Sequence, residues 1–277
     1  MRCGGCLSVR SMGERKRVAV VTGASTGIGA AAAIRLAREP GTELVLVARR
    51  EELLRELAES LPCRATYVAL DLTDEDAPAR VRAHLEAEHG GALHLLVNNA
   101  GAAWRAKFAD GGYANVRRHM ELNFDAVARL TEELLPLLRA SAPSAIVNVA
   151  STAGRVSRAG TGAYSASKFA LVGWTDSLHA EEKPHGVHVG MVLPGFVRTE
   201  GFPAAELREK ALTRWVVSKP EKVAEAIYEA GPGGRAERYV PRPYGLAAVA
   251  RILFPSLVRR VLTGGAASKL TTSTGGE

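Results

Sequence analysis

Val18-Ala-Val-Val-Thr-Gly-Ala-Ser-Thr-Gly-Ile-Gly29 is the stretch that decides the fold. Val18–Val21 is a short apolar run typical of a buried strand, and a glycine-rich turn separates it from a segment that is predicted to be helical. Gly23, Gly27 and Gly29 leave room for a tight turn, for a pyrophosphate near the backbone, and for close packing of helix on sheet. The helix N-terminus then offers amide donors and a partial positive charge to phosphates. The spacing is G-x-x-x-G-x-G, and a purely structural turn is the alternative.

Apolar runs alternate with helical segments along the rest of the chain. Because these runs are apolar on both faces, they imply a parallel sheet that is covered on both sides, and hence a doubly wound α/β fold in one domain. The later strands are predicted at Leu44–Val47, Thr66–Leu70, Leu93–Val97, Ala145–Val149, Val187–Leu193 and Arg238–Val240. The helices are predicted at Ala30–Arg38, Glu51–Glu59, Asp74–His89, Val116–Leu138, Ala163–Lys183 and Lys219–Ala230.

The composition is that of a globular protein with basic ends. Of the 277 residues, 47% are hydrophobic and 23% are charged, and the net charge is +7. No apolar run reaches the roughly 20 residues of a spanning helix, and the N-terminus lacks the apolar core of a secretory signal, so we expect a cytoplasmic protein. The basic excess lies at the two ends, without a nucleic-acid-binding motif, and we expect no nucleic-acid partner. We divide the chain into a flexible basic tail (1–16), a catalytic domain (17–242), and an amphipathic helix with a disordered tail (243–277).

Cysteine and histidine give no sign of a disulfide framework or a metal site. Cys3 and Cys6 form a C-x-x-C pair in a glycine-rich tail without a partner pair, and Met12 is an alternative start that would remove both. Cys63 stands alone. Three histidines in or near the predicted helix Ala163–Lys183 lack metal-ligand spacing, and we expect no metal. They are His179, His185 and His188.

Tyr164-Ser-Ala-Ser-Lys168 places a phenol and an ammonium four residues apart on a predicted helix. Residues at i and i+4 share one helix face, so the two polar groups can meet in one pocket. A nearby cation favours the phenolate and lowers the pKa of the phenol from about 10, which makes tyrosine a usable acid or base near neutrality. For this short motif alone, a solvent-exposed pair is the alternative.

Six motifs occur in order and at suitable spacing between residues 17 and 242. They are T-G-x-x-x-G-x-G at Thr22–Gly29, Asn98-Asn99-Ala100-Gly101, Asn123, Ser151 thirteen residues before Tyr164, Tyr164-x-x-x-Lys168, and Pro194-Gly195. Each is weak alone, but together they resemble the short-chain dehydrogenase/reductase family. The length and the Asn-Asn-Ala-Gly motif favour its short single-domain branch over the longer sugar epimerase branch. The resemblance implies a Rossmann-type parallel sheet with helices on both faces.

The resemblance also implies a catalytic tetrad. Tyr164 would be the general acid in carbonyl reduction and the base in alcohol oxidation. Lys168 would lower the pKa of Tyr164 and hydrogen-bond the nicotinamide ribose. Ser151 would hold the substrate oxygen, and Asn123 would anchor a water that links Lys168 to solvent. The hydride comes from the nicotinamide, while the protein supplies position and a proton.

The end of the second predicted strand bears on the choice of cofactor. An acidic residue there would accept the ribose 2′-hydroxyl of NAD, but the strand ends in Val47-Ala48-Arg49-Arg50. Guanidinium groups suit a 2′-phosphate and Ser25 adds a hydroxyl donor, so we expect NADP(H). In the alternative, the arginines only begin a solvated helix and face Glu51 and Glu52. The expected cofactor contacts are Gly23, Ser25, Thr26, Gly27, Ile28, Gly29, Arg49, Arg50, Asp71, Leu72, Asn98, Ala100, Gly101, Tyr164, Lys168, Pro194, Gly195, Val197 and Thr199.

Residues after Gly195 correspond to the substrate lid of the family, here Phe196–Trp215 with Phe202. We expect Trp104 and Phe108 to line the opposite wall. Such a pocket is mostly apolar, which favours a lipophilic ketone, aldehyde or secondary alcohol as the substrate. By analogy with the family, the protein would form a homodimer or homotetramer.

Tyr244–Leu262 is an apolar segment that contains three arginines, and Pro255 should break or kink its helix. Two interpretations stay open. The helix packs on its own domain or on another subunit, or it lies on an anionic membrane surface, helped by the basic ends. In the second case the protein is peripheral at the membrane and reaches membrane-dissolved substrates.

These observations favour an NADP(H)-dependent oxidoreductase that interconverts a lipophilic ketone or aldehyde and an alcohol. One alternative is a catalytically silent nucleotide sensor or scaffold on the same fold. The full tetrad counts against it, because a sensor needs neither Tyr164 nor Ser151. The other is an NAD-linked alcohol dehydrogenase, against which Arg49 and the missing acidic residue count.

Overall fold

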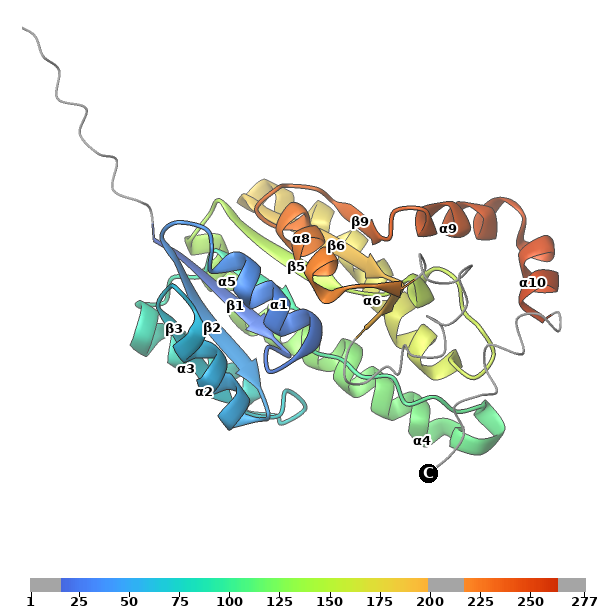
Figure 1. Ribbon diagram of the computed structural model, residues 1–277, viewed down its shortest axis with the longest axis horizontal. Coiled ribbons are helices and arrows are strands. Elements are labelled where there is room, and N and C mark those ends of the chain that lie inside the picture. The colour runs from blue at the N-terminus through green and yellow to red at the C-terminus, as the bar shows by residue number, and fades with distance from the viewer. Residues whose placement is uncertain (1–15, 199–216, 264–277) are drawn as a thin grey trace, which may run out of the picture.

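A seven-stranded parallel sheet forms the centre of the structure, a computed structural model that describes residues 16–198 and 217–263 (Figure 1). Its strands are β1 Arg17–Thr22, β2 Thr42–Ala48, β3 Ala65–Ala69, β4 Leu95–Asn98, β5 Ser144–Val149, β6 Val187–Pro194 and β9 Glu237–Val240. The strand order is β3-β2-β1-β4-β5-β6-β9. The direction of winding reverses between β1 and β4, which confirms the expected doubly wound, Rossmann-type fold.

Helices cover both faces of this sheet. The helices are α1 Gly27–Leu36, α2 Glu51–Ser60, α3 Ala77–His89, α4 Phe108–Met120, α5 Ala126–Ala140, α6 Gly162–Glu182 and α8 Pro220–Ala230. Buried side chains of α1, α2 and α8 form one core with the sheet, and those of α3, α5 and α6 form the other. Figure 1 shows α1 and α8 side by side on the face toward the viewer.

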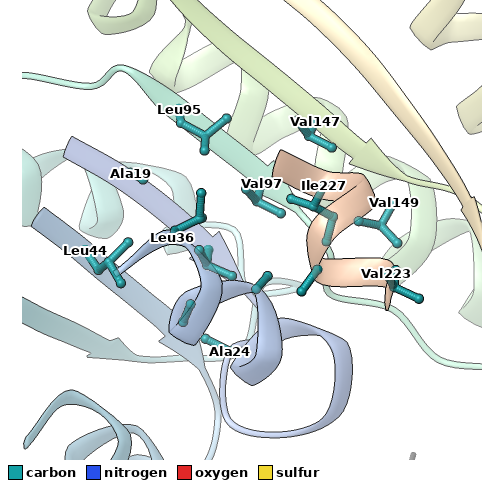
Figure 2. Close-up of a cluster of buried hydrophobic side chains, with 14 of the residues drawn as sticks. Ala19, Ala24, Leu36, Leu44, Leu95, Val97, Val147, Val149, Val223 and Ile227 are labelled. Atoms are coloured by element: carbon teal, nitrogen blue, oxygen red, sulfur yellow. The ribbon is translucent and has the colours of Figure 1, made fainter. Parts of the chain in front are cut away.

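Each strand supplies both cores because successive side chains point to opposite faces. On β1, Ala19 and Val21 join the core under α1 and α8, while Val18 and Val20 join the core on the other face. Figure 2 shows the first core, where Ile227 of α8 lies over the central strands. Full burial of an aliphatic side chain of this size contributes about 1.5–3 kcal/mol, so these cores hold the strand order in place.

The helix predicted at Val116–Leu138 is longer than expected and is not uniform. It runs from α4 through a π-helical turn at Glu121–Asp125 into α5. Asn123 lies in that turn and is fully buried. Single π-helical turns inside α-helices are often found at functional sites. The spacing of apolar residues cannot reveal such a turn, because the single extra residue of a π-helical turn hardly changes the apolar pattern.

The C-terminal segment forms two helices, α9 Tyr244–Leu253 and α10 Pro255–Thr263, which extend beyond the sheet in Figure 1. The expected break at proline is confirmed, since Phe254 between them is not helical. The inner side of α9 packs on its own domain through the buried Ala248 and through the ring of Tyr244, which lies against Gly195. Contact of the segment with lipid or another subunit stays a prediction. The large apolar side chains exposed here are Leu246, Val249, Ile252, Leu253, Phe254, Leu257 and Val261.

Within residues 16–198 and 217–263, none of the helices combines the length and the apolar character that crossing a membrane requires.

Replacement of Gly29 by alanine tests the packing of the first turn. A Cβ at Gly29 would lie 2.1 Å from the carbonyl oxygen of Gly23 and 2.7 Å from the side-chain nitrogen of Asn99. Since backbone must then move, we expect the free energy of unfolding to fall by about 1–3 kcal/mol in urea titrations.

Gly173 provides the matched control, because it is exposed inside α6 and a Cβ added there would meet no atom within 4 Å. Gly173→Ala should stabilise the protein by about 0.5–1 kcal/mol. Equal effects of the two substitutions would contradict this account of the turn.

Candidate active site

Two adjoining cavities lie at the carboxyl end of the parallel strands. The larger has a volume of about 620 Å³ and the smaller one of about 400 Å³. Gly101, Ala102 and Trp104, which follow β4, line both. In doubly wound sheets, ligands bind outside the carboxyl ends of the strands where the winding reverses. The cavities therefore lie where this fold places a ligand.

The glycine-rich turn between β1 and α1 is held against the end of β4. Gly23 and Gly27 have φ angles of 64° and 59°, in the left-handed region that favours glycine. The side-chain amide of Asn99 donates to the carbonyl oxygen of Thr22 at 2.9 Å. In return, the hydroxyl of Thr22 accepts from the backbone nitrogens of Asn99 and Ala100 at 2.9 and 3.0 Å. These bonds fix the turn beside the cavities.

The smaller cavity carries the two arginines that follow β2. One guanidinium nitrogen of Arg50 donates to the hydroxyl of Thr26 at 2.9 Å and to that of Ser25 at 3.4 Å. Arg49 is 76% exposed and lies 3.6 Å from the carboxylate of Asp71. The expected cofactor residues that line this cavity are Gly23, Ser25, Thr26, Arg49, Arg50, Asp71, Leu72, Ala100 and Gly101.

The carboxylate of Asp71 is held in its charged form. Burial opposes the charge, but hydrogen bonds from the backbone nitrogen and the hydroxyl of Thr73, at 3.0 and 2.9 Å, outweigh it. With the charge of Arg49 they keep the pKa of Asp71 below its usual value. The smaller cavity thus presents three cations, Arg49, Arg50 and Arg118, and the carboxylates of Asp71 and Glu121.

The larger cavity contains Tyr164, Lys168 and Ser151 together. Tyr164 and Lys168 come from α6, and Ser151 precedes the 3₁₀ turn Thr152–Gly154 that follows β5. The hydroxyl of Ser151 accepts from the backbone nitrogen of Ala153 at 3.1 Å and donates to the carbonyl oxygen of Pro194 at 3.4 Å, and it lies near enough to the Tyr164 side chain to lower the pKa of the phenol. A hydroxyl pair is thus placed at one point of the cavity wall.

Asn123 and Lys168 adjoin each other at Gly101. The side chain of Asn123 accepts from the backbone nitrogen of Ala102 and donates to its carbonyl oxygen, both at 3.0 Å. It also donates to the hydroxyl of Ser167. A Cβ at Gly101 would lie 2.9 Å from the Asn123 oxygen and 3.5 Å from the Lys168 nitrogen, so only glycine fits between them. The structure therefore brings all four predicted tetrad residues to one region.

The acid–base behaviour of the pair differs from the sequence-based expectation. Burial raises the pKa of Tyr164, opposed by the hydrogen bond from Ser151 and the positive charge of Arg105. The ammonium of Lys168 donates to the carbonyl oxygen of Val149 at 2.9 Å, and burial lowers its own pKa to about 8. The expectation that Lys168 lowers the pKa of Tyr164 is thus corrected for the protein alone. Burial penalises the charged form of each group, and the effects that lower the pKa of Tyr164 come from Ser151 and Arg105 and not from Lys168.

The remaining predicted residues are divided between the cavity walls and the packing behind them. Asn98 needs correction, because its side chain is 1% exposed and donates to Thr131 and Asn148 within the core. Its neighbour Asn99 lines the larger cavity. Gly27 belongs to the turn, and Gly29 packs behind it against Gly23. Four other expected cofactor residues line the larger cavity: Ile28, Pro194, Gly195 and Val197.

Of the two side chains expected to line a substrate wall, one lines the cavities. Trp104 lines both cavities, whereas Phe108 is 75% exposed at the start of α4 and lines neither. Thr199, Phe202 and Trp215 lie outside the described residues. Among the described residues, no group of three acidic, histidine or cysteine side chains is arranged to hold a metal ion.

Several residues of the larger cavity escaped the sequence argument. Arg105, Arg155, Arg158 and Tyr244 line it, and they come from loops and from the start of α9. His119 lies behind the wall, where its Nε2 accepts from the backbone nitrogen of Trp104 at 3.0 Å and its ring contacts that of Tyr164 edge-on. The sequence feature that could have identified His119 was its position on α4, one helical turn before Asn123.

Comparisons with known proteins agree with this geometry. The short chain dehydrogenase family matches residues 17–210, and the chain belongs to this family of oxidoreductases, which use NAD or NADP. The chain is 37% identical to a cis-4-hydroxycyclohexanecarboxylate dehydrogenase of Sinomonas cyclohexanicum, over 78% of this chain and 90% of that one. It is also 37% identical to the granaticin polyketide synthase putative ketoacyl reductase 1 of Streptomyces violaceoruber, over 79% and 81%.

A solved structure supports the same assignment. A short-chain dehydrogenase from Streptomyces avermitilis superimposes with a TM-score of 0.72 at 30% identity. The match covers 95% of this chain and all of that one, so the similarity extends beyond the residues that carry the family motifs.

The pKa of Lys168 can be measured directly. Because burial penalises the ammonium, we expect the side chain to titrate near pH 8 in the cofactor-free protein, so that it is mostly neutral above that pH. The measurement is NMR of lysine labelled at the Nζ nitrogen, with the signal assigned by its loss in Lys168→Met. Titration at or above the ordinary value of 10.5 would show that the ammonium is better solvated than the structure indicates.

Proposed function

We propose that the protein is an NADP(H)-dependent oxidoreductase that interconverts a carbonyl compound and an alcohol, with Tyr164 as the general acid or base. The observation that carries this proposal is that Tyr164, Ser151 and Lys168 line one cavity that adjoins the glycine-rich turn. A silent sensor or scaffold would need the turn but not a partly buried phenol beside a hydroxyl.

The residues present fit a dinucleotide. The glycine-rich turn offers backbone donors at the N-terminus of α1, and any side chain at Gly29 would collide with Gly23. When bound, the nicotinamide supplies or accepts the hydride. Ile28, Pro194, Gly195 and Val197 would hold its ring end, since they line the larger cavity next to Tyr164.

In the direction of reduction, Tyr164 would donate the proton that the carbonyl oxygen requires. Its raised pKa keeps the phenol protonated at neutral pH, which suits an acid that must hold its proton until the transfer. The hydroxyl of Ser151 would hold the same oxygen and orient the carbonyl. Lys168 and Asn123 adjoin at Gly101 behind the phenol, where a bound water would return the proton from solvent.

Arg49 and Arg50 support the choice of NADP(H). Both line the smaller cavity, and Arg50 lies over the turn through Thr26 and Ser25. This arrangement would place a planar, permanently charged group beside a ribose 2′-phosphate. The carboxylate of Asp71 follows the neighbouring strand β3 and is already paired with Arg49 and Thr73.

For the substrate we propose a small apolar carbonyl compound or alcohol. Trp104, Val156, Phe196 and Tyr244 give the cavity apolar surface beside the Tyr164 hydroxyl. The Sinomonas relative is named for a cyclic hydroxy acid, and the Streptomyces relative for a ketoacyl group. Both names describe oxidation or reduction at a carbon that bears an oxygen, which is consistent with this proposal.

Replacement of Tyr164 by phenylalanine tests the acid–base role. We expect turnover of carbonyl substrates to fall by about 10²–10⁴-fold, because the proton donor is lost while the ring remains. Binding of NADPH, followed by nicotinamide fluorescence, should stay within about threefold of the wild type. Retained turnover in this variant would rule out Tyr164 as the proton donor.

Replacement of Arg50 or Arg49 by alanine tests the cofactor choice. Each charge-assisted contact to phosphate contributes about 1.5–3 kcal/mol, so the affinity for NADPH should fall by about 10- to 100-fold. The affinity for NADH, which lacks the 2′-phosphate, should change by less than about threefold. Arg55→Ala is the control, because Arg55 lies on α2 and pairs with Glu52 outside the cavity. Equal losses for both nucleotides would remove the arginines from phosphate recognition.

A further inference from the structure

The larger cavity is lined by several cationic side chains, and the described lining residues include no acidic side chain. Its lining includes Arg105, Arg155, Arg158 and Lys168. A cavity of about 620 Å³ is large enough for a small organic ligand. A purely lipophilic ligand would have no group that interacts with these cations. The position of each cation therefore needs an explanation.

Arg155 and Lys168 are neutralised or occupied by the protein itself. Arg155 lies 2.7 Å from the carboxylate of Glu237 and 3.9 Å from that of Asp176. The ammonium of Lys168 donates to the carbonyl oxygen of Val149. Their positions are thus explained by structure and by the proposed chemistry.

The position of Arg158 is not explained by a carboxylate partner among the described residues. It lies in the loop before α6, and its guanidinium stacks over the ring of Phe196 at 4.7 Å. No carboxylate of the described residues lies within 4.0 Å of it. The Phe196 ring covers one face of the guanidinium, while the hydrogen-bond donors lie in its plane and can serve a ligand in the cavity.

The surroundings of Arg158 make its charge costly. Burial, and then the positive charge of Arg105 nearby, lower the pKa of the guanidinium. Two like charges at the wall of one partly desolvated cavity repel each other, and both are stabilised when an anion is bound between them. Arginine recognises carboxylate and phosphate through paired hydrogen bonds.

We propose that the substrate carries an anionic group, a carboxylate or a phosphate, apart from its reacting carbonyl or alcohol, and that Arg158 binds this group. Arg105 adds positive charge to the same site. This inference rests on the proposed function, because it assumes that the substrate occupies the cavity of Tyr164. It narrows the substrate class from apolar carbonyl compounds to those with an anionic end.

Binding of unreactive ligands tests this inference without requiring turnover. The protein, saturated with whichever of NADPH and NADH it binds, is titrated with hexanoate, hexyl phosphate and the neutral hexanamide by calorimetry. We expect at least one anion to bind about tenfold or more tightly than the amide. A preference for hexanoate identifies carboxylic acids as the class, and a preference for hexyl phosphate identifies phosphate-bearing carriers.

Substitutions assign the preference to its residue. Arg158→Gln should abolish the preference while the affinity for hexanamide changes by less than about threefold. Arg158→Lys should retain part of it, because the charge remains without the paired donors. Arg38→Gln, an exposed arginine just beyond α1, should retain all of it and controls for net charge.

Three outcomes would overturn the inference: no preference in the wild type, binding of none of the ligands, or a preference that survives in Arg158→Gln. Failure of the proposed function looks different. If Tyr164→Phe keeps its turnover, the mechanism is wrong, yet the anion preference and its loss in Arg158→Gln would stand.

Discussion

The close approach of backbone to backbone at the first turn is the constraint on which the site depends. The position of Gly29 leaves no space for a side chain, and Asn99 reaches from the end of β4 to the carbonyl of Thr22. These contacts hold the N-terminus of α1 and the end of β4 together, where the sheet winding reverses. Gly101 and Ala102 follow directly and line both cavities. The glycine-rich turn and the wall that the two cavities share are therefore positioned by one set of contacts.

Burial determines the acid–base properties more than the neighbouring charges do. Tyr164 and Lys168 share a helix face, and in both the neutral form is favoured, so that one pKa rises and the other falls to about 8. The motif alone suggested an ion pair between phenolate and ammonium. In the structure the ammonium is directed to the carbonyl of Val149, and the phenol interacts with Ser151. The cation that does lower the pKa of Tyr164 is Arg105, a loop residue.

The sheet, its order of elements and the meeting of Asn123, Ser151, Tyr164 and Lys168 in one region could be predicted from the sequence, because they depend on local periodicity and short motifs. Asn98 and Asn99 show where this reasoning stops. Adjacent residues at the end of a strand point in different directions. The structure shows that β4 ends at Asn98, so that the side chain of Asn98 enters the core and that of Asn99 reaches the turn. The sequence could not decide between Phe108 and Trp104 either, because the path of the loop before α4 follows no repeat. Arg105 and Arg158 are 53 positions apart, and only the tertiary structure brings them to one cavity.

The inner side of α9 completes the larger cavity with Tyr244, Ala247 and Ala248, although the family profile ends at residue 210. The turn and the arginines after β2 lie in the first half of the chain, whereas this wall lies near its end. The glycine-rich turn and the α9 wall can therefore change independently during evolution. Mutations in α9 would reshape the larger cavity and leave the glycine-rich turn untouched, so that related chains can differ in this cavity while they keep the same turn.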